Sequence, residues 1–291
     1  MTAAQWLILA LKASIMLTVF GLGLMATFQN ATYLLRRPAL LARAFLSMDI
    51  VMPGIALLIA TTLALPLEVK VALVALALSP VPPILYKKQL TAGGRMDYVV
   101  GLLVAMSLLA VVFVPLAVMI VDHVFDREAV LSPASIAKIM VMTVLAPLIV
   151  GLVARQLFPT AEKAASAIRM VAGIILVAGV VPFMIKLWPV LKPFLGNGTV
   201  LVMVALAIVG LAVGHVLGGP RAADRTALAL STASRHPGVA LAVATSGTAL
   251  DAVEAKPALA LILLYLVVAT IVCIPYQKWR ERSETASDPT K

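Results

Sequence analysis

Four side chains that can carry charge interrupt otherwise apolar stretches of the sequence. Arg235 and His236 are adjacent in one stretch, and Asp49 and Lys12 lie in two others. A charge at the centre of a bilayer costs roughly 2.5–3.5 kcal/mol on insertion scales, so we expect these residues to face a cavity or a partner. The guanidinium of an arginine offers a fork of donors suited to carboxylate or phosphate. These residues indicate binding chemistry inside a membrane.

Asp49 and Lys12 admit two interpretations. Asp49 lies about 11 residues into its apolar stretch, and Lys12 lies about eight residues into the neighbouring stretch from the opposite side. At about 1.5 Å per residue, the two depths differ by only a few ångströms. One interpretation is a buried ion pair, in which loss of either residue would strand the other charge. The other is ion coupling, in which Asp49 takes up and releases a proton.

The composition indicates the environment in which these charged residues lie. The chain has 291 residues, of which 62% are hydrophobic and 12% are charged. A soluble domain is about half apolar and about one quarter charged, so a bilayer is the expected environment. The net charge of +10 is divided among short clusters between apolar stretches, which argues against nucleic acid as a partner. Cys273 is the single cysteine, and no spacing of potential ligands predicts a metal or cofactor.

Nine stretches are long and apolar enough to be predicted as membrane helices, each of which needs roughly 20 mostly apolar residues. Short links with proline, glycine or charge separate them. We therefore predict an all-α polytopic membrane protein with one transmembrane domain over residues 1–280 and a disordered polar tail over 281–291. The predicted helices are 5–28, 39–62, 68–90, 97–121, 135–157, 167–188, 199–218, 224–247 and 257–278.

Lysine and arginine are divided unevenly between the two sides of these helices. Fifteen lie on one side and six on the other, with Lys12 and Arg235 inside the spans. Because cytoplasmic loops carry the excess of these residues, we expect the N-terminus outside and the C-terminus, including the tail, in the cytoplasm. The alanine-, valine- and arginine-rich composition favours a bacterial inner membrane.

The third and eighth predicted helices contain breaks. The letters ALALS precede both: the third continues Pro80-Val81-Pro82-Pro83, and the eighth continues towards Pro237-Gly238. Proline removes a backbone donor and clashes with the preceding turn, so neither helix is expected to be continuous. Both breaks lie ~16 Å deep, near the centre of a hydrocarbon layer ~30 Å thick. The two helices enter from opposite sides, which is typical of inverted repeats around the binding site of a transporter.

The two breaks predict a binding site for a small anion. Helices that restart after them would point N–H groups and positive dipole ends into the centre. Arg235 either binds the substrate or has a structural role. In the structural role it bonds to carbonyl groups of the broken helix or takes the place of a lost sodium ion. His236 binds the substrate, carries a proton near neutral pH, or is a structural residue. The predicted substrate-binding residues are Arg235, His236, Ser79, Ser231, Ser234, Pro82 and Gly238.

Several short motifs, in this order, make the chain resemble the bile acid:sodium symporter superfamily over nearly its full length. The resemblance implies panel and core domains, with the two broken helices crossing in the core, in a nine-helix version that lacks the first of ten helices. The motifs are Phe20-Gly21-Leu22-Gly23-Leu24, Leu35-Arg36-Arg37-Pro38, Met52-Pro53, Gly93-Gly94 and Gly238-Val239-Ala240-Leu241-Ala242.

The resemblance also shows where this chain departs from the sodium symporters. Their carboxylate at the second crossing is matched by Ser231, and their glutamine by Arg235. Sodium needs several oxygen ligands, and a guanidinium nearby repels it. We therefore do not expect the usual sodium sites. Four further ligand positions are occupied by Leu85, Tyr86, Val99 and Leu103.

The resulting prediction is a secondary transporter that moves a small organic anion by alternating access. Coupling is to a proton, to an exchanged anion, or absent. One alternative is a sodium-dependent bile acid-type symporter whose rearranged ligands include Ser79, Ser231, Thr232 and Ser234. A membrane sensor that binds a small anion is an alternative from another class. We expect no catalytic residues, because an enzyme would need an acid–base pair or a metal cluster in a cavity.

Overall fold

The computed structural model describes residues 3–82, 86–124, 133–244 and 255–287, and every regular element in these ranges is helical. The first half contains α1 (Ala3–Gly23), α2 (Phe28–Ala31), α3 (Pro38–Phe45), η1 (Leu46–Val51), α4 (Met52–Thr62), α5 (Leu67–Leu78), α6 (Tyr86–Thr91) and α7 (Met96–Val124). The second half contains α8 (Pro133–Met140), η3 (Val141–Leu145), α9 (Ala146–Leu157), η4 (Pro159–Ala164), α10 (Ala165–Leu195), α11 (Thr199–Leu217), α12 (Ala222–Ala233), α13 (Pro237–Ala244) and α14 (Ala255–Ser287).

This order confirms the predicted multi-pass helical fold. Within the described residues, six helices are long and apolar enough to cross a membrane, and α1 contributes a shorter apolar helix over Lys12–Gly23. The third and eighth predicted helices do not reach that length because each is divided in two. The six long segments are Pro38–Thr62, Met96–Ile120, Ala137–Leu157, Pro159–Pro182, Thr199–Leu217 and Lys256–Ser283.

Both predicted breaks are confirmed. α5 ends at Leu78, and Ser79 has an extended backbone with φ −80° and ψ 142°. α12 ends at Ala233, and Ser234 is also extended, with φ −117° and ψ 148°. Pro80 explains the first ending, because the residue before a proline is pushed out of the helical region. At the second break the proline lies three residues further on, because Arg235 and His236 separate Ser234 from Pro237. α13 restarts with Pro237 as its first residue, where the missing N–H has no helical partner to lose.

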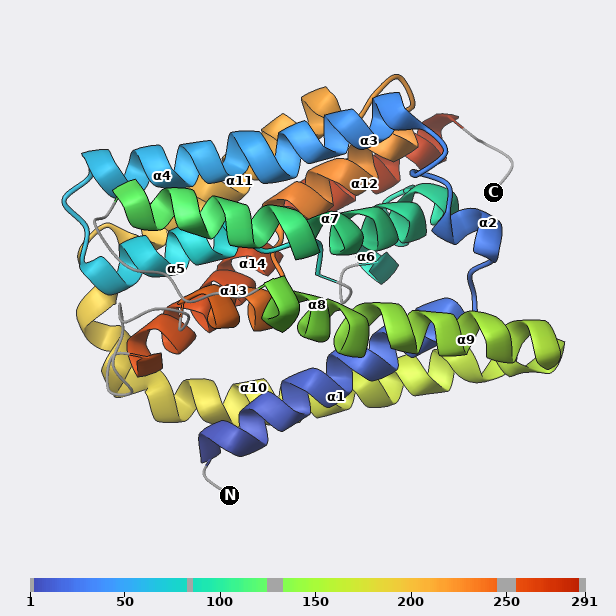
Figure 1. Cartoon of the computed structure of the whole chain (residues 1–291), viewed down its shortest axis with the longest axis horizontal. Helices are drawn as coiled ribbons and strands as arrows, with labels where there is room; N and C mark the ends of the chain where they lie inside the picture. The colour runs from blue at the N-terminus through green and yellow to red at the C-terminus, as the bar shows by residue number, and fades with distance from the viewer. Residues whose placement is uncertain (1–2, 83–85, 125–132, 245–254, 288–291) are drawn as a thin grey trace.

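The helices form two layers (Figure 1). The panel layer contains α1, α10 and the continuous helix α8–η3–α9, and α1 packs against both α9 and α10. Gly23 and Gly151 bring α1 and α9 together: an added Cβ on Gly23 would lie 2.9 Å from the Cα of Gly151. The core layer contains the remaining long helices. The layers meet where α10 packs on α14 and where α8 packs on α7 and α13.

Two helices contain a π turn immediately before a proline. η1 precedes Met52-Pro53, and η3 precedes Ala146-Pro147. The N–H of Met52 bonds to the carbonyl of Ser47, and that of Ala146 bonds to the carbonyl of Val141. Both bonds span five residues, so the wider turn gives the proline ring room against the preceding carbonyl groups. Asp49 lies on the first of these turns, so its side chain leaves the helix in a different direction from that expected in a regular α-helix.

The polar tail predicted over 281–291 was wrong in part, because α14 continues through Ser287. This segment has no proline or glycine before Pro289, and its arginine, glutamate and alanine residues are good helix formers. Residues 288–291 lie outside the described ranges.

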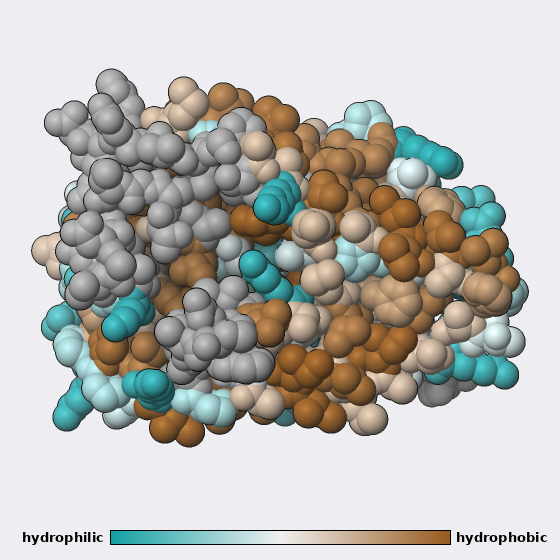
Figure 2. All heavy atoms as spheres, turned by 60° about the horizontal axis from the view of Figure 1, so that its bottom comes forward, coloured by the Kyte–Doolittle hydropathy of each residue, from teal (hydrophilic) through white to brown (hydrophobic). Residues whose placement is uncertain are grey.

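The exterior of the helices is largely apolar. Figure 2 shows a hydrophobic surface on the side of the panel layer, with hydrophilic residues at its ends and a few near its middle. On α10, the exposed fractions of Met170, Ile174 and Ile185 are 64%, 60% and 70%. Large apolar side chains at such exposure are typical of a surface that faces lipid.

Candidate functional site

The two helix breaks are in direct contact. The backbone N–H of His236 donates to the carbonyl oxygen of Pro80 at 3.0 Å. The Nη1 atom of Arg235 donates to the carbonyl oxygen of Ser79 at 3.3 Å. α13 also packs along α5. The two interrupted segments, which are about 155 residues apart in the sequence, therefore form one junction.

Arg235 lies buried inside this junction, with 2% of its surface exposed. Besides Ser79, its Nη1 atom donates to the carbonyl oxygen of Met48 at 3.4 Å, so the guanidinium also contacts the π turn η1. Its Nη2 atom has no hydrogen-bond partner among the described residues. Asp49 lies within electrostatic range of this guanidinium, and its Oδ2 atom likewise has no partner among those residues.

The predicted ion pair between Lys12 and Asp49 is absent from the described part of the chain. Asp49 is 5% exposed and lies beside Arg235, whereas Lys12 is exposed on α1. The similar depths estimated from the sequence described only the positions of Lys12 and Asp49 along the membrane normal. α1 belongs to the panel layer and η1 to the core layer, so the two residues are separated sideways.

Three hydroxyl groups near the junction form hydrogen bonds with neighbouring side chains or with the backbone. Ser231 Oγ accepts a hydrogen bond from Gln89 Nε2 at 2.5 Å, and Thr232 Oγ1 bonds with Ser47 Oγ at 2.9 Å. Ser79 Oγ donates to the carbonyl oxygen of Leu76 at 2.7 Å. Gln89, on α6, was not predicted as a site residue, because a polar residue near a helix end gives no distinctive signal.

A cavity of about 470 Å³ lies between the panel and core layers. α1, α8 and η3 line it from one layer, and α13 and α14 line it from the other. Its walls are mainly apolar, with two lysines on the panel side and His236 at the start of α13. The lining residues are Lys12, Ile15, Met16, Lys138, Ile139, Met142, Thr143, His236, Pro237, Gly238, Leu241, Leu259, Ile262 and Leu263.

His236 joins the junction to this cavity. Its Nδ1 atom accepts the N–H of Val239 at 3.3 Å, which caps the first turn of α13. A neutral imidazole that accepts at Nδ1 carries its proton on Nε2, and the hydrogen-bond pattern assigns that tautomer here. Nε2 has no hydrogen-bond partner among the described residues. His236 therefore lines the cavity and carries a buried donor without a partner among the described residues.

The predicted substrate-binding residues divide into three groups. His236 and Gly238 line the cavity, together with Lys12, which was predicted for ion coupling. Arg235 and Ser234 instead border a void of about 10 Å³ behind it, next to Tyr265. Ser79, Pro82 and Ser231 are buried outside the cavity lining. Lys138 was one of the six basic residues assigned to the outer side, and its sequence position gave no indication that it lines a cavity.

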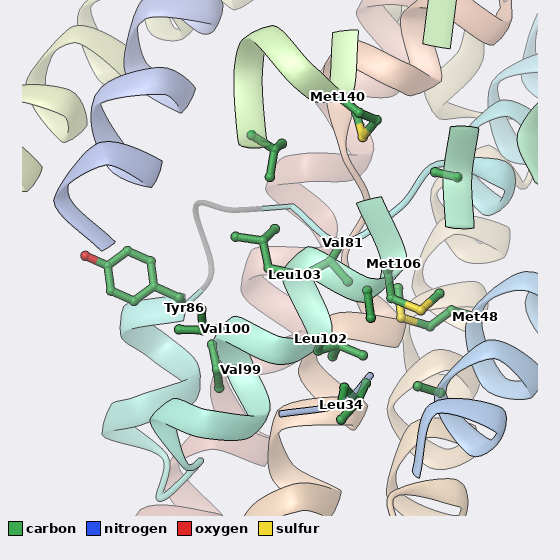
Figure 3. Close-up of a cluster of buried hydrophobic side chains, with 14 of the residues drawn as sticks. Leu34, Met48, Val81, Tyr86, Val99, Val100, Leu102, Leu103, Met106 and Met140 are labelled. Atoms are coloured by element: carbon green, nitrogen blue, oxygen red, sulfur yellow. The ribbon is translucent and has the colours of Figure 1, made fainter. Parts of the chain in front are cut away.

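Two positions that match sodium ligands of the resembled family, Val99 and Leu103, are apolar in the structure. Figure 3 shows Val99, Leu103 and Tyr86 within a buried hydrophobic cluster. Val99 and Leu103 are 3% and 2% exposed and supply no oxygen atom. Leu85 lies outside the described residues. In the described ranges, no three His, Cys, Asp or Glu residues gather in a group that could hold a metal ion.

Comparison with known proteins identifies one family. The sequence model of one family, the Sodium Bile acid symporter family, matches residues 13–193. The matched range runs from within α1 to near the end of α10, and it includes the first break and most of the panel layer. A comparison with curated proteins gives no match.

Proposed function

Because the chain belongs to the sodium bile acid symporter family, we propose that it carries a small organic anion across the membrane by alternating access. The cavity of about 470 Å³ between the two layers supports this proposal most directly. Its volume lies in the range of pockets that hold small molecules, and a few polar groups interrupt mainly apolar walls. Such a cavity suits an anion with an apolar body.

The polar groups around the cavity favour a negatively charged substrate. Lys12 and Lys138 provide ammonium groups from the panel layer. The core layer provides His236 and the start of α13 at Pro237 and Gly238. The first turn of a helix exposes backbone N–H groups and the positive end of the helix dipole. Both sides of the cavity thus attract an anion, and the carboxylates Asp49 and Asp224 do not line it.

We propose that Arg235 acts as a permanently attached cation in place of a transported sodium ion. It occupies the position matched to a sodium-site glutamine of the resembled family, and it bonds to carbonyl oxygens of Met48 and Ser79. Carbonyl oxygens are also the ligands that a hard cation uses. The hydroxyls of Ser231 and Thr232 are already engaged by Gln89 and Ser47, which disfavours a rearranged sodium site.

Transport without sodium leaves three modes: proton coupling, anion exchange and uniport. Asp49 is the candidate for proton coupling, because it is buried beside Arg235 with an oxygen atom that lacks a partner among the described residues. Protonation of Asp49 would leave the charge of Arg235 uncompensated. That change would alter the attraction of the junction for an anion in the neighbouring cavity.

The proposal is tested with purified protein in liposomes. Currents on a solid-supported membrane are recorded for a panel of organic anions, with sodium present or replaced by choline, at several pH values. We expect anion-dependent currents that persist in choline. Currents that require sodium would instead support a sodium symporter. Binding without either current or counterflow of a radiolabelled anion would support a sensor.

The double variant Lys12→Gln/Lys138→Gln tests the cavity itself. We expect the KM for the transported anion to rise about tenfold, because two ammonium groups that face it are lost. Lys192→Gln is the matched control, since Lys192 is an exposed lysine of the same layer outside the cavity lining. An equal KM for all three proteins would contradict the proposed binding site.

A further inference from the structure

Tyr33 lies at the centre of an arginine cluster near one end of the helices. The Cζ atom of Arg37 lies 3.9 Å from the centroid of the Tyr33 ring, and that of Arg95 lies 5.4 Å from it. The Nη1 atoms of Arg95 and Arg221 each donate to the Tyr33 hydroxyl at 3.3 Å. A single aromatic side chain therefore holds three guanidinium groups from three separate segments.

A second cavity opens beside this cluster, with a volume of about 270 Å³. Arg36, Arg37 and Arg95 line it, and Asp97 is the one acidic residue of its described lining. Asp97 bonds to Arg95 at 2.6 Å and accepts the amide of Asn30 at 2.7 Å, so both of its oxygens are engaged. The ion pairs found among the described residues give neither Arg36 nor Arg37 a carboxylate partner.

Positive charge remains in excess around this cavity. Asp224 is the other carboxylate within electrostatic range of Arg37, Arg95 and Arg221, and it is 1% exposed. With Arg36, four guanidinium groups thus face two carboxylates. Guanidinium groups bind phosphate oxygens through pairs of parallel hydrogen bonds, which makes such a cluster suited to a phosphate group.

The surroundings of the cavity indicate where that phosphate group comes from. The apolar membrane segments Pro38–Thr62 and Met96–Ile120 both begin next to its lining residues, so the cavity lies near the boundary between membrane and water. Phe28 and Leu35 flank the lining in the sequence and are 49% and 44% exposed. Exposed apolar side chains beside a phosphate-binding cavity suit the acyl chains of a lipid.

We propose that this cavity binds a phosphate group, supplied by the headgroup of an anionic phospholipid. The site is separate from the proposed transport cavity, with which it shares no lining residue. A bound headgroup would hold together the segment after α2, the start of α7 and, through Tyr33, the segment before α12. Basic pockets between membrane helices are suited to such headgroups.

The experiment measures lipid binding to the purified full-length protein in a nonionic detergent by native mass spectrometry. Phosphatidylglycerol and phosphatidylcholine with identical acyl chains are the lipid probes, and inorganic phosphate is the soluble probe. We expect phosphatidylglycerol to bind preferentially. We expect Arg36→Gln/Arg37→Gln to weaken that binding by about 30-fold, through the loss of two guanidinium groups at the membrane surface.

Lys278→Gln/Arg282→Gln is the matched control, because it removes two exposed positive charges from α14 that do not belong to the lining of the cavity. Tyr33→Phe is the second test variant, since it removes the hydroxyl that positions Arg95 and Arg221 without removing a charge. Equal binding by control and test variants would overturn the proposal, as would equal binding of the two lipids. Binding of inorganic phosphate alone, lost in Arg36→Gln/Arg37→Gln, would keep the phosphate site and overturn its assignment to a lipid.

Discussion

At the scale of single residues, the protein places a guanidinium and a carboxylate inside the membrane and leaves one atom of each without a partner among the described residues. Arg235 bonds to carbonyl groups of Met48 and Ser79, and Asp49 lies within its electrostatic range. Two isolated charges at this depth would each be costly, whereas neighbouring opposite charges offset part of that cost. The energetic cost of burying either charge therefore depends on the presence of the other.

A double-mutant cycle tests this dependence. We expect Arg235→Gln to lower the free energy of unfolding by about 3 kcal/mol, because it leaves the charge of Asp49 buried alone. Asp49→Asn/Arg235→Gln should recover at least about 1 kcal/mol of that loss. Thermal unfolding in detergent, followed by tryptophan fluorescence, measures each value.

Arg43→Gln is the control for that cycle, because Arg43 is an exposed arginine on α3 in the same membrane segment. Its effect should be within about 0.5 kcal/mol. Asp49→Asn combined with Arg43→Gln should be additive. If the changes in the free energy of unfolding for Asp49→Asn and Arg235→Gln are also additive, the two side chains do not interact.

At the scale of helices, small residues allow close packing. Gly214 on α11 faces α12, and an added Cβ there would lie 2.5 Å from the Cα of Ala229. Gly210 and Gly218, one helical turn away on either side, have equally close backbone contacts with α12. This stripe sets the position of the segment that leads to Ser234 and Arg235. Helix association in membranes relies on such contacts, because lipid provides no hydrophobic driving force between helices.

Substitution of two glycines distinguishes close packing from helix propensity. Gly214→Ala should destabilise the protein by about 1–3 kcal/mol, since its methyl group would overlap the backbone of α12. Gly173→Ala, on α10, has no atom within 4 Å of the added methyl group and should be neutral or stabilising by up to about 1 kcal/mol. Thermal unfolding compares the two. Equal shifts would show that α11 does not need the close contact.

The sequence predicted helices better than it predicted contacts between them. Hydropathy identified the membrane segments, and the prolines after Ser79 and before Gly238 identified the two breaks, because both signals are local. The meeting of Lys138 with His236 at one cavity depends on how the layers pack, which periodicity does not encode. The same limit explains the error at Lys12 and Asp49, whose depths agreed while their layers differed. The π turn at Asp49 was also not predicted, although Pro53 was its local cause.

At the scale of the whole molecule, the proposed transport cycle requires the panel and core layers to move relative to each other. The cavity between them is lined by Ile139 of α8 on one side and Leu241 of α13 on the other. These helices pack against each other. A covalent link across this boundary would fix the layers in one arrangement.

Cross-linking tests this motion in a Cys273→Ser background. Joining Ile139→Cys to Leu241→Cys with a short bifunctional maleimide should abolish transport, and the unlinked variant should remain active. The control pair is Ser14→Cys and Ala172→Cys on α1 and α10, whose parent residues share a hydrogen bond of 2.9 Å inside the panel layer. Full transport after linkage between α8 and α13 would contradict a rocking motion of the layers.

If Arg235 replaces a transported sodium ion, as proposed, its attachment to the chain has an energetic consequence for the direction of transport. A sodium ion that travels with an anion cancels its charge, whereas a guanidinium that stays behind does not. A carrier of this kind moves net negative charge, so the membrane voltage acts on every turnover. At 100 mV, negative inside, the voltage contributes about 2.3 kcal/mol per elementary charge and favours outward accumulation of a monovalent anion by about 50-fold. Voltage alone would therefore make the protein an exporter, and uptake would require each anion to enter with a proton or in exchange for another anion.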